Sequence, residues 1–281
     1  MLRLLINLDR SQDRLQVISK ALTDLGLSFS RVQAIDGKKL TEEEVRQWTI
    51  PKAKRHLCCR DLTRTEIACC LSHRKCWQML VDSNEEWALI LEDDCIFSDR
   101  AREFMADAEW MPATLKLCQL AHIGHSGECV LIERRKVILD DKTEIIRIIK
   151  PHHVGAAAYL IHRDVAQLAL ELTGKLEAPV DEVLFSLNYP MGRKYAGWVV
   201  NPYPVRVDHD LESTIGHGEE NEGYGDPCTE SQRWRKVFTR IRISLYRKFR
   251  LFRLFGETGS SMVPWSRSEL AREKDAAKFP S

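Results

Sequence analysis

The chain has 281 residues, of which 44% are hydrophobic and 30% charged, and its formal net charge is +1. These values are ordinary for one large globular domain with a sizeable core, and no overall field favours nucleic acid as a partner. No apolar run approaches the roughly 18 residues of a membrane span, and the N-terminus lacks the pattern of a signal peptide, so we expect a cytoplasmic protein.

In chain order, hydrophobic periodicity and turn residues predict alternating strands and helices. Thr41 and Glu44 predict a capping box that opens a short helix. The alternation predicts an α/β fold with a mostly parallel central sheet flanked by helices. The predicted strands are 2–8, 28–35, 86–94, 115–124, 155–162, strands around the turn at 140–141 and the extended segment 199–210, and the main predicted helices are 11–25, 63–81, 99–110, 163–172 and 178–187.

The stretch ALILEDDC, residues 88–95, ends an apolar strand in three adjacent carboxylates. They repel one another, and burying any of them is costly unless a positive charge lies beside it. Ligands of open α/β sheets bind at the carboxyl ends of strands, where carboxylates can hold a divalent cation. Glu92 and Asp94 can point the same way from an extended segment. A metal site is favoured over the alternative, a solvated turn.

Three other groups of polar residues carry weaker signals. Ser72 and His73 lie on the predicted helix 63–81, where a histidine is more often structural than catalytic. Asp181 opens a helix and could act as a general base, although capping also explains it. His209, in the non-helical stretch VDHD, could complete a metal site, but from the pattern alone a polar surface loop is the favoured interpretation.

The nine cysteines, an odd number, agree with a reducing compartment. Adjacent cysteines occur at 58–59 and 69–70, with Cys76 nearby, and invite a zinc interpretation. Zinc sites usually use spacings that let two thiolates converge, whereas adjacent side chains point apart. Small buried hydrophobic residues on helix faces are the favoured interpretation.

The C-terminal part of the chain changes character after about residue 211. Residues 212–227 are polar and glycine-rich and predict a loop. Residues 233–255 hold nine Lys or Arg and no acid, with apolar residues at helical spacing. This pattern is typical of a basic amphipathic helix on an anionic membrane surface, while a helix packed on the domain is the alternative. We expect a domain at 1–227, the helical segment at 228–256 and a polar tail at 257–281.

Six segments, in order, resemble glycosyltransferase family 25, which includes bacterial lipooligosaccharide galactosyltransferases and, more distantly, collagen galactosyltransferases. The resemblance covers roughly residues 3–215. It departs from the family's pattern at Thr65, where a glycine is usual, and around 205–215, where relatives often carry a glutamine. The segments are INLDRSQDRL, RVQAIDGKKL, TEIACCLSHRKCWQML, ALILEDDCIF, GAAAYLIHRDVAQ and PVDEVLF.

The resemblance implies a GT-A-like fold and an inverting, metal-dependent transfer of a hexose to a lipooligosaccharide or lipopolysaccharide core, forming a β linkage. The donor would be a UDP-sugar, with galactose the first expectation and glucose the next, and the cofactor Mn²⁺ or Mg²⁺. A lipid-linked acceptor places the enzyme on the cytoplasmic face of the bacterial inner membrane. The implied site has Asp181 as the base, donor contacts from Asn7, Leu8, Asp9, Arg10, Arg14, Ser72, His73 and Asp93, and metal ligands Glu92, Asp94 and His209, the last by analogy with GT-A enzymes generally.

Besides a peripheral membrane scaffold defined by the basic helix alone, two other functions remain open from the sequence. One is a non-catalytic module of the same fold that binds a nucleotide or a glycan, which would bind UDP without turning over a donor. The other is a metal-dependent phosphohydrolase, which would cleave phosphate esters without a sugar acceptor.

Overall fold

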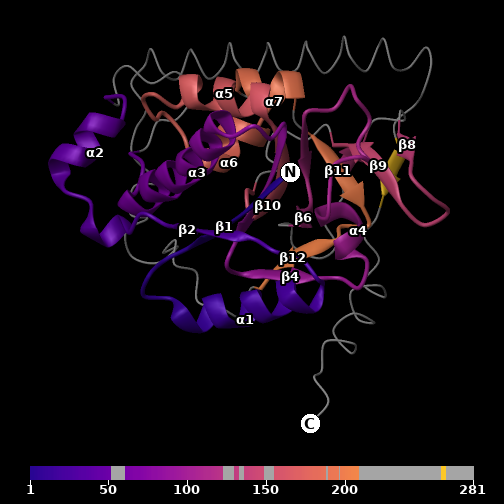
Figure 1. Cartoon of the computed structure of the whole chain (residues 1–281). Helices are drawn as coiled ribbons and strands as arrows, with labels where there is room; N and C mark the ends of the chain where they lie inside the picture. The colour runs from indigo at the N-terminus through magenta and orange to yellow at the C-terminus, as the bar shows by residue number, and fades with distance from the viewer. Residues whose placement is uncertain are drawn as a thin grey trace.

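The computed structural model describes residues 1–51, 61–122, 130–132, 136–148, 155–187, 189–195, 197–208 and 261–263 (Figure 1). Its helices are α1 (Gln12–Asp24), α2 (Glu42–Trp48), α3 (Arg64–Asp82), α4 (Ala101–Met105), α5 (Arg163–Leu172), α6 (Val180–Phe185), α7 (Pro190–Tyr195) and the short 3₁₀ helix η1 (Gly37–Lys39). Its strands are β1 (Leu2–Asn7), β2 (Ser30–Gln33), β3 (Trp87–Glu92), β4 (Cys95–Phe97), β5 (Leu117–Gln119), β6 (Ala121–His122), β7 (Val130–Ile132), β8 (Val137–Ile138), β9 (Glu144–Arg147), β10 (Ala158–His162), β11 (Trp198–Asn201), β12 (Val205–Val207) and β13 (Ser261–Val263).

An eight-stranded sheet with the order β2-β1-β3-β10-β5-β11-β9-β8 forms the centre of the fold. The strands β10 and β9 are antiparallel to their neighbours, and the other six share one direction. Two smaller sheets have the orders β4-β12-β6 and β13-β7. The predicted α/β fold with a mostly parallel central sheet flanked by helices is confirmed.

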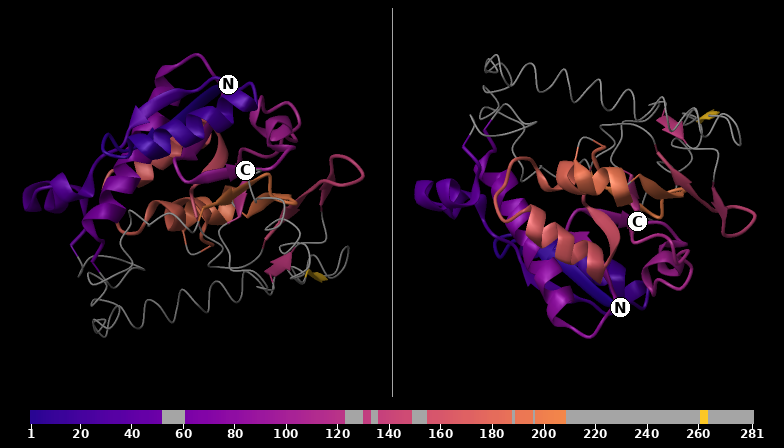
Figure 2. Two further views of the ribbon diagram at one scale, coloured as in Figure 1. Left: turned by 90° about the horizontal axis from the view of Figure 1, so that it is seen from below. Right: turned by 90° about the horizontal axis from the view of Figure 1, so that it is seen from above.

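Helices cover both faces of this sheet (Figures 1 and 2). The strands β1, β3, β10 and β5 contribute side chains to the core on each face. Successive side chains of a strand point to opposite faces. In β3, Ala88 and Ile90 pack toward α3, α5 and α6, whereas Leu89 and Leu91 pack toward α1 and α4. Because β3 is buried on both faces, its sequence at 88–91 is continuously apolar instead of alternating between apolar and polar residues.

The helices α2 and α3 each begin with a capping box built on a threonine hydroxyl. Thr41 and Glu44 form the predicted capping box of α2. Thr63 and Glu66 form a second one at the start of α3, a helix of 19 residues that crosses the sheet beside β1 and β3. The caps satisfy backbone N–H groups that the first turn leaves without partners.

The structure corrects two predicted elements. The helix predicted over 99–110 is only α4, because the Asp107 side chain accepts a hydrogen bond from the Glu109 N–H at 3.0 Å and stabilises a turn instead. The strand predicted over 115–124 is divided at Leu120 into β5, in the large sheet, and β6, in the small sheet with β4 and β12.

Within the described ranges, no helix is both long and apolar enough to cross a membrane. The basic segment 233–255 and His209 lie outside the described residues.

Candidate functional site

An open pocket of about 660 Å³ lies where β1 and β3 end beside the first turns of α3. Because β1 and β3 are parallel and Ile6 is in register with Glu92, their carboxyl ends meet at one edge of the sheet. This is the edge at which open α/β sheets bind ligands. The pocket is lined by Ile6, Asn7, Leu8, Arg10, Ala34, Ile35, Gly37, Thr65, Ala68, Cys69, Ser72, Glu92, Asp93 and Asp94.

Asp93 is held in place by residues from the first strand and first helix. Its Oδ2 accepts a hydrogen bond from Asn7 Nδ2 at 2.7 Å, and its Oδ1 lies 3.4 Å from Arg14 Nη1. Burial nevertheless raises the pKa of this carboxyl, against the lowering effect of Asn7 and Arg14. Both Asp93 oxygens are therefore oriented before any ligand arrives.

The buried side chain of Asn7 links the Asp93 carboxylate to Arg31 through hydrogen bonds. Its Nδ2 also donates to the Ser11 carbonyl at 3.0 Å, and its Oδ1 accepts from Arg31 Nε at 2.9 Å. Arg31 in turn pairs with Asp9 at 2.7 Å, so Asp9 is turned toward β2 and solvent rather than into the pocket. Of the residues predicted around the end of the first strand, Asn7, Leu8 and Arg10 line the pocket, whereas Asp9 supports it through Arg31.

Asp94 differs from its neighbours because one of its oxygens is buried and has no hydrogen-bond partner among the described residues. No hydrogen bond reaches Asp94 Oδ1 from any described residue. Burial and the charges of Glu92 and Asp93 raise the pKa of this carboxyl well above its usual range. Its main-chain oxygen accepts a hydrogen bond from the Asp208 N–H at 2.8 Å, which joins the end of β12 to the cluster. A buried carboxylate oxygen without a donor is suited to a cation.

Glu92 is held from behind by a chain of buried hydrogen bonds. Trp77 Nε1 donates to the Tyr159 hydroxyl at 2.9 Å, that hydroxyl lies 2.9 Å from His73 Nδ1, and His73 Nε2 lies 3.0 Å from Glu92 Oε1. An indole N–H can only donate, so the Tyr159 oxygen accepts from Trp77, whereas the donor in the Tyr159–His73 and His73–Glu92 contacts depends on which imidazole nitrogen carries a proton. His73 is completely buried and reaches the pocket only through Glu92.

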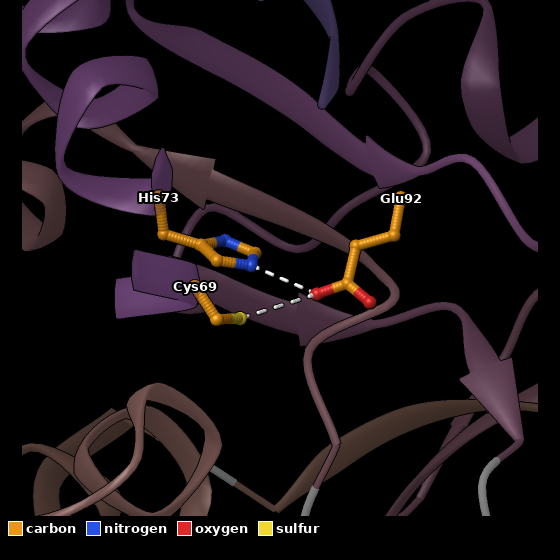
Figure 3. Close-up of side chains that lie close together, drawn as sticks. All are labelled: Cys69, His73 and Glu92. Atoms are coloured by element: carbon orange, nitrogen blue, oxygen red, sulfur yellow. Dashed lines mark hydrogen bonds and ion pairs between the residues drawn. The ribbon is translucent and has the colours of Figure 1, made fainter. Parts of the chain in front are cut away.

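Cys69 lies one helical turn before His73 and approaches the same carboxylate. Its Sγ is 3.8 Å from Glu92 Oε1, and the thiol, the imidazole and the carboxylate converge on one point (Figure 3). Burial, followed by the charges of Glu92, Cys70 and Asp181, raises the pKa of the thiol. The thiol is therefore protonated in the absence of a cation and contributes a weak hydrogen bond.

The hydroxyl of Ser72 is used by the main chain. It accepts from the Ile35 N–H at 2.8 Å and donates to the Ala68 carbonyl at 2.7 Å, tying the segment after β2 to α3. Gly37 packs against the same helix, where an added Cβ would lie 2.8 Å from Thr65 Cα. These contacts give Ser72 a role in shaping the pocket wall.

Asp181 opens α6, as the sequence indicated, but it does not line the pocket. Its Oδ1 accepts from the Glu182 N–H at 2.8 Å. Burial, with smaller contributions from Glu182 and Glu92, raises the pKa of Asp181 from 3.8 to about 6. A carboxyl with this pKa can exchange a proton near neutral pH.

The structure brings most of the predicted residues to one place. Asn7, Leu8, Arg10, Ser72 and the three acids line the pocket, whereas Arg14 and His73 support it and His209 lies outside the described residues. Sequence reasoning missed the supporting residues Cys69, Trp77, Tyr159 and Arg31. Positions 69, 73 and 77 are spaced one helical turn apart. This spacing is the signal that could have grouped Cys69 and Trp77 with His73.

Comparisons with known proteins agree with this arrangement. The sequence model described as glycosyltransferase family 25 (LPS biosynthesis protein) matches residues 1–184. Procollagen galactosyltransferase 2 of Mus musculus is 35% identical over 96 residues, 33% of this chain and 15% of that protein. Procollagen galactosyltransferase 1-B of Xenopus laevis is 29% identical over 194 residues, 64% of this chain and 30% of that protein.

The lipooligosaccharide biosynthesis protein lex-1 of Haemophilus influenzae is 28% identical over 133 residues, 45% of this chain and 44% of that protein. The matches thus span less than half the length of each of these relatives. The match to a solved glycosyltransferase involved in glycosylation of the PBCV-1 major capsid covers 86% of this chain and 100% of that chain at 10% identity, with a TM-score of 0.40.

The raised pKa of Asp181 predicts that Asp181→Asn stabilises the fold at neutral and alkaline pH. The folded state binds this proton more tightly than the unfolded state, so ionisation costs stability once the pH rises through about 6. Above that pH, the substitution should raise the free energy of unfolding by about 3 kcal/mol. Below about pH 4 the difference should vanish, because the carboxyl is then protonated in both states. Urea unfolding followed by circular dichroism at several pH values measures this.

A matched control is Asp140→Asn. Asp140 has its pKa lowered to about 2, chiefly by a hydrogen bond from Arg100, so the sign reverses and this substitution should destabilise the fold above about pH 4. Equal effects of the two substitutions at all pH values would contradict the assignment of Asp181 as a raised-pKa carboxyl.

Proposed function

The chain belongs to glycosyltransferase family 25, and we propose that it is an inverting, metal-dependent hexosyltransferase that uses a UDP-sugar. Galactose is the first expectation for the sugar, since relatives that match the chain are named as galactosyltransferases. The acceptor proposed is a lipooligosaccharide or lipopolysaccharide core, in line with the name of the Haemophilus relative. The observation that carries the proposal is the buried Asp94 oxygen, which no described residue contacts by a hydrogen bond, among three carboxylates in the pocket.

The proposed cation is Mn²⁺ or Mg²⁺, held by Asp94 and Glu92, with His209 a further ligand expected from the sequence. The fit rests on chemistry, because carboxylate oxygens suit these ions and Asp94 Oδ1 has no other described partner. When bound, such a cation would neutralise the negative charge that develops on the departing diphosphate.

The chain's own residues account for donor placement in this proposal. Asp93, oriented by Asn7 and Arg14, is placed to accept hydrogen bonds from a ribose or hexose hydroxyl. Arg10 lines the pocket and supplies positive charge for the diphosphate, although Asp36 pairs with it in this structure. His73 acts only by holding Glu92 in one orientation.

Asp181 is proposed as the general base. Inversion requires a single in-line attack by an acceptor hydroxyl, whose proton must be taken as the bond forms. With a pKa of about 6, Asp181 is ionised at neutral pH, yet it retains more basicity than an ordinary aspartate. It also lies close enough to Glu92 and Cys69 for their charges to influence one another.

The first experiment is a UDP-release assay on the purified full-length chain with a panel of nucleotide sugars. UDP-galactose should be turned over with Mn²⁺, and EDTA or Asp94→Asn should abolish turnover because both remove the cation from the diphosphate. Asp82→Asn, at the exposed far end of α3, is the matched control and should retain the wild-type rate. Turnover that survives both EDTA and Asp94→Asn would contradict the metal proposal, and hydrolysis of phosphate esters would favour the phosphohydrolase instead.

Loss of the general base should affect transfer more than binding. Asp181→Asn should lower the transfer rate by about 10²- to 10⁴-fold while UDP affinity stays near that of the wild type. The wild-type rate should also fall as the pH drops through about 6, since a protonated Asp181 cannot accept the acceptor's proton. Steady-state kinetics and calorimetric UDP binding separate the two effects. An unchanged transfer rate in Asp181→Asn would assign the base elsewhere.

We also propose, from the sequence alone, that the basic segment 233–255 associates with an anionic membrane surface, where a lipid-linked acceptor would be met. Replacing Arg240, Arg242 and Arg247 by glutamine should reduce flotation with phosphatidylglycerol vesicles while turnover of a soluble acceptor is retained. Equal flotation of both proteins would indicate that the segment packs elsewhere.

A further inference from the structure

Cys69, His73 and Glu92 present three different ligand atoms to one point in the pocket wall. The thiol sulfur, the imidazole Nε2 and a carboxylate oxygen all lie within 4.8 Å of one another. Cys69 and His73 are one turn apart on α3, so they share a helix face, and Glu92 meets them from the end of β3 (Figure 3). The rigid elements that carry these residues hold the three atoms together without a cation.

We propose that this trio is a binding site for a borderline-soft divalent cation such as Zn²⁺, with water completing a tetrahedron. Sulfur and imidazole ligands favour zinc and related ions, whereas manganese and magnesium prefer oxygen. The site is therefore chemically distinct from the carboxylate cluster proposed for Mn²⁺, although the two share Glu92. Three protein ligands with an open fourth position match the composition of accessible zinc sites rather than that of closed structural ones.

The surroundings allow a cation to enter and the ligands to adjust. Cys69 and Glu92 both line the open pocket, so the site is reached from solvent. On binding, the Cys69 thiol would release its proton to solvent, and His73 would coordinate through Nε2 while Nδ1 carries a proton. The proton on Nδ1 then faces the Tyr159 oxygen, 2.9 Å away, which already accepts from Trp77 and has a second lone pair.

The neighbouring cysteine supplies a contrast within the same helix. Cys70 is completely buried in the core beneath α3, and it is not part of the converging group. Adjacent side chains on a helix diverge, which agrees with the argument against a paired-cysteine zinc site. The zinc ligand set combines Cys69 with a histidine and a carboxylate instead.

Where the chain acts as proposed above, a shared Glu92 makes the two cations antagonists. Zinc on the trio would draw Glu92 toward α3 and away from the carboxylate cluster. This consequence rests on the proposed transferase function, whereas zinc binding itself does not.

The test uses Co²⁺, a spectroscopic substitute for zinc, added to the reduced, metal-free, full-length chain without nucleotide sugar. We expect a thiolate-to-cobalt charge-transfer band in the near ultraviolet and tetrahedral visible bands that saturate at one equivalent and are removed by Zn²⁺. Cys69→Ser, which keeps the side-chain volume, should lose the charge-transfer band and weaken zinc binding by roughly tenfold or more. Cys70→Ala is the matched control and should keep both.

Each outcome decides the proposal. Absence of the charge-transfer band in the folded wild type, or its persistence in Cys69→Ser, would overturn it by showing that no thiolate or a different thiolate binds. Circular dichroism confirms that each variant is folded, and Cys69→Ala serves where Cys69→Ser does not fold. The cobalt titration contains no sugar donor, so it tests the zinc site separately from the transferase activity. A negative titration would not contradict the transferase proposal, and absence of transferase activity would not contradict a positive titration. A second measurement tests the antagonism of the two cations in a transfer assay supplemented with Mn²⁺. The Zn²⁺ concentration that halves the transfer rate should be roughly tenfold higher for Cys69→Ser than for the wild type, with each rate compared with that protein's own rate without zinc.

Discussion

The organisation of this protein depends on the cost of placing three adjacent carboxylates at the end of a buried strand. Each is partly or largely removed from water, and each charge disfavours ionisation of the next. The fold meets this cost differently for each acid. Asp93 is paired with Asn7 and Arg14, Glu92 is hydrogen-bonded to His73, and Asp94 keeps a buried oxygen without a described partner. The incomplete compensation at Asp94 is the basis of the proposed metal site, since a cation would complete it.

One helix, α3, supplies most of the rigidity around this cluster. Ser72 binds the segment after β2, His73 holds Glu92, and Trp77 donates to the Tyr159 hydroxyl, which contacts His73 Nδ1. The same helix begins at a capping box, so its first turn is anchored where it forms the pocket wall. A donor bound here would meet preoriented groups, which lowers the entropy lost on binding and favours positioned chemistry.

The pocket also combines two kinds of ligand chemistry around one residue. The carboxylate cluster offers oxygen atoms only, whereas the face of α3 adds sulfur and nitrogen. Glu92 belongs to both because its two oxygens are inequivalent, one of them being committed to His73 and Cys69. A family 25 enzyme with this arrangement would have its donor site and a cation-sensitive element in the same cavity, so metal identity becomes a variable that could govern activity.

By itself, the sequence determined the α/β class, the strand that ends in Glu92, the caps of α2 and the family, because apolar periodicity, local capping and ordered motifs are local properties of the chain. It also singled out half of the residues that line the pocket, including all three acids. Only the tertiary structure decided that His73 supports Glu92 rather than facing the pocket, that Ser72 binds main chain, and that Tyr159, 86 residues from His73, completes the chain of hydrogen bonds. The physical reason is that hydrogen-bond partners and pKa shifts arise from burial and from contacts between distant segments, which no local pattern encodes.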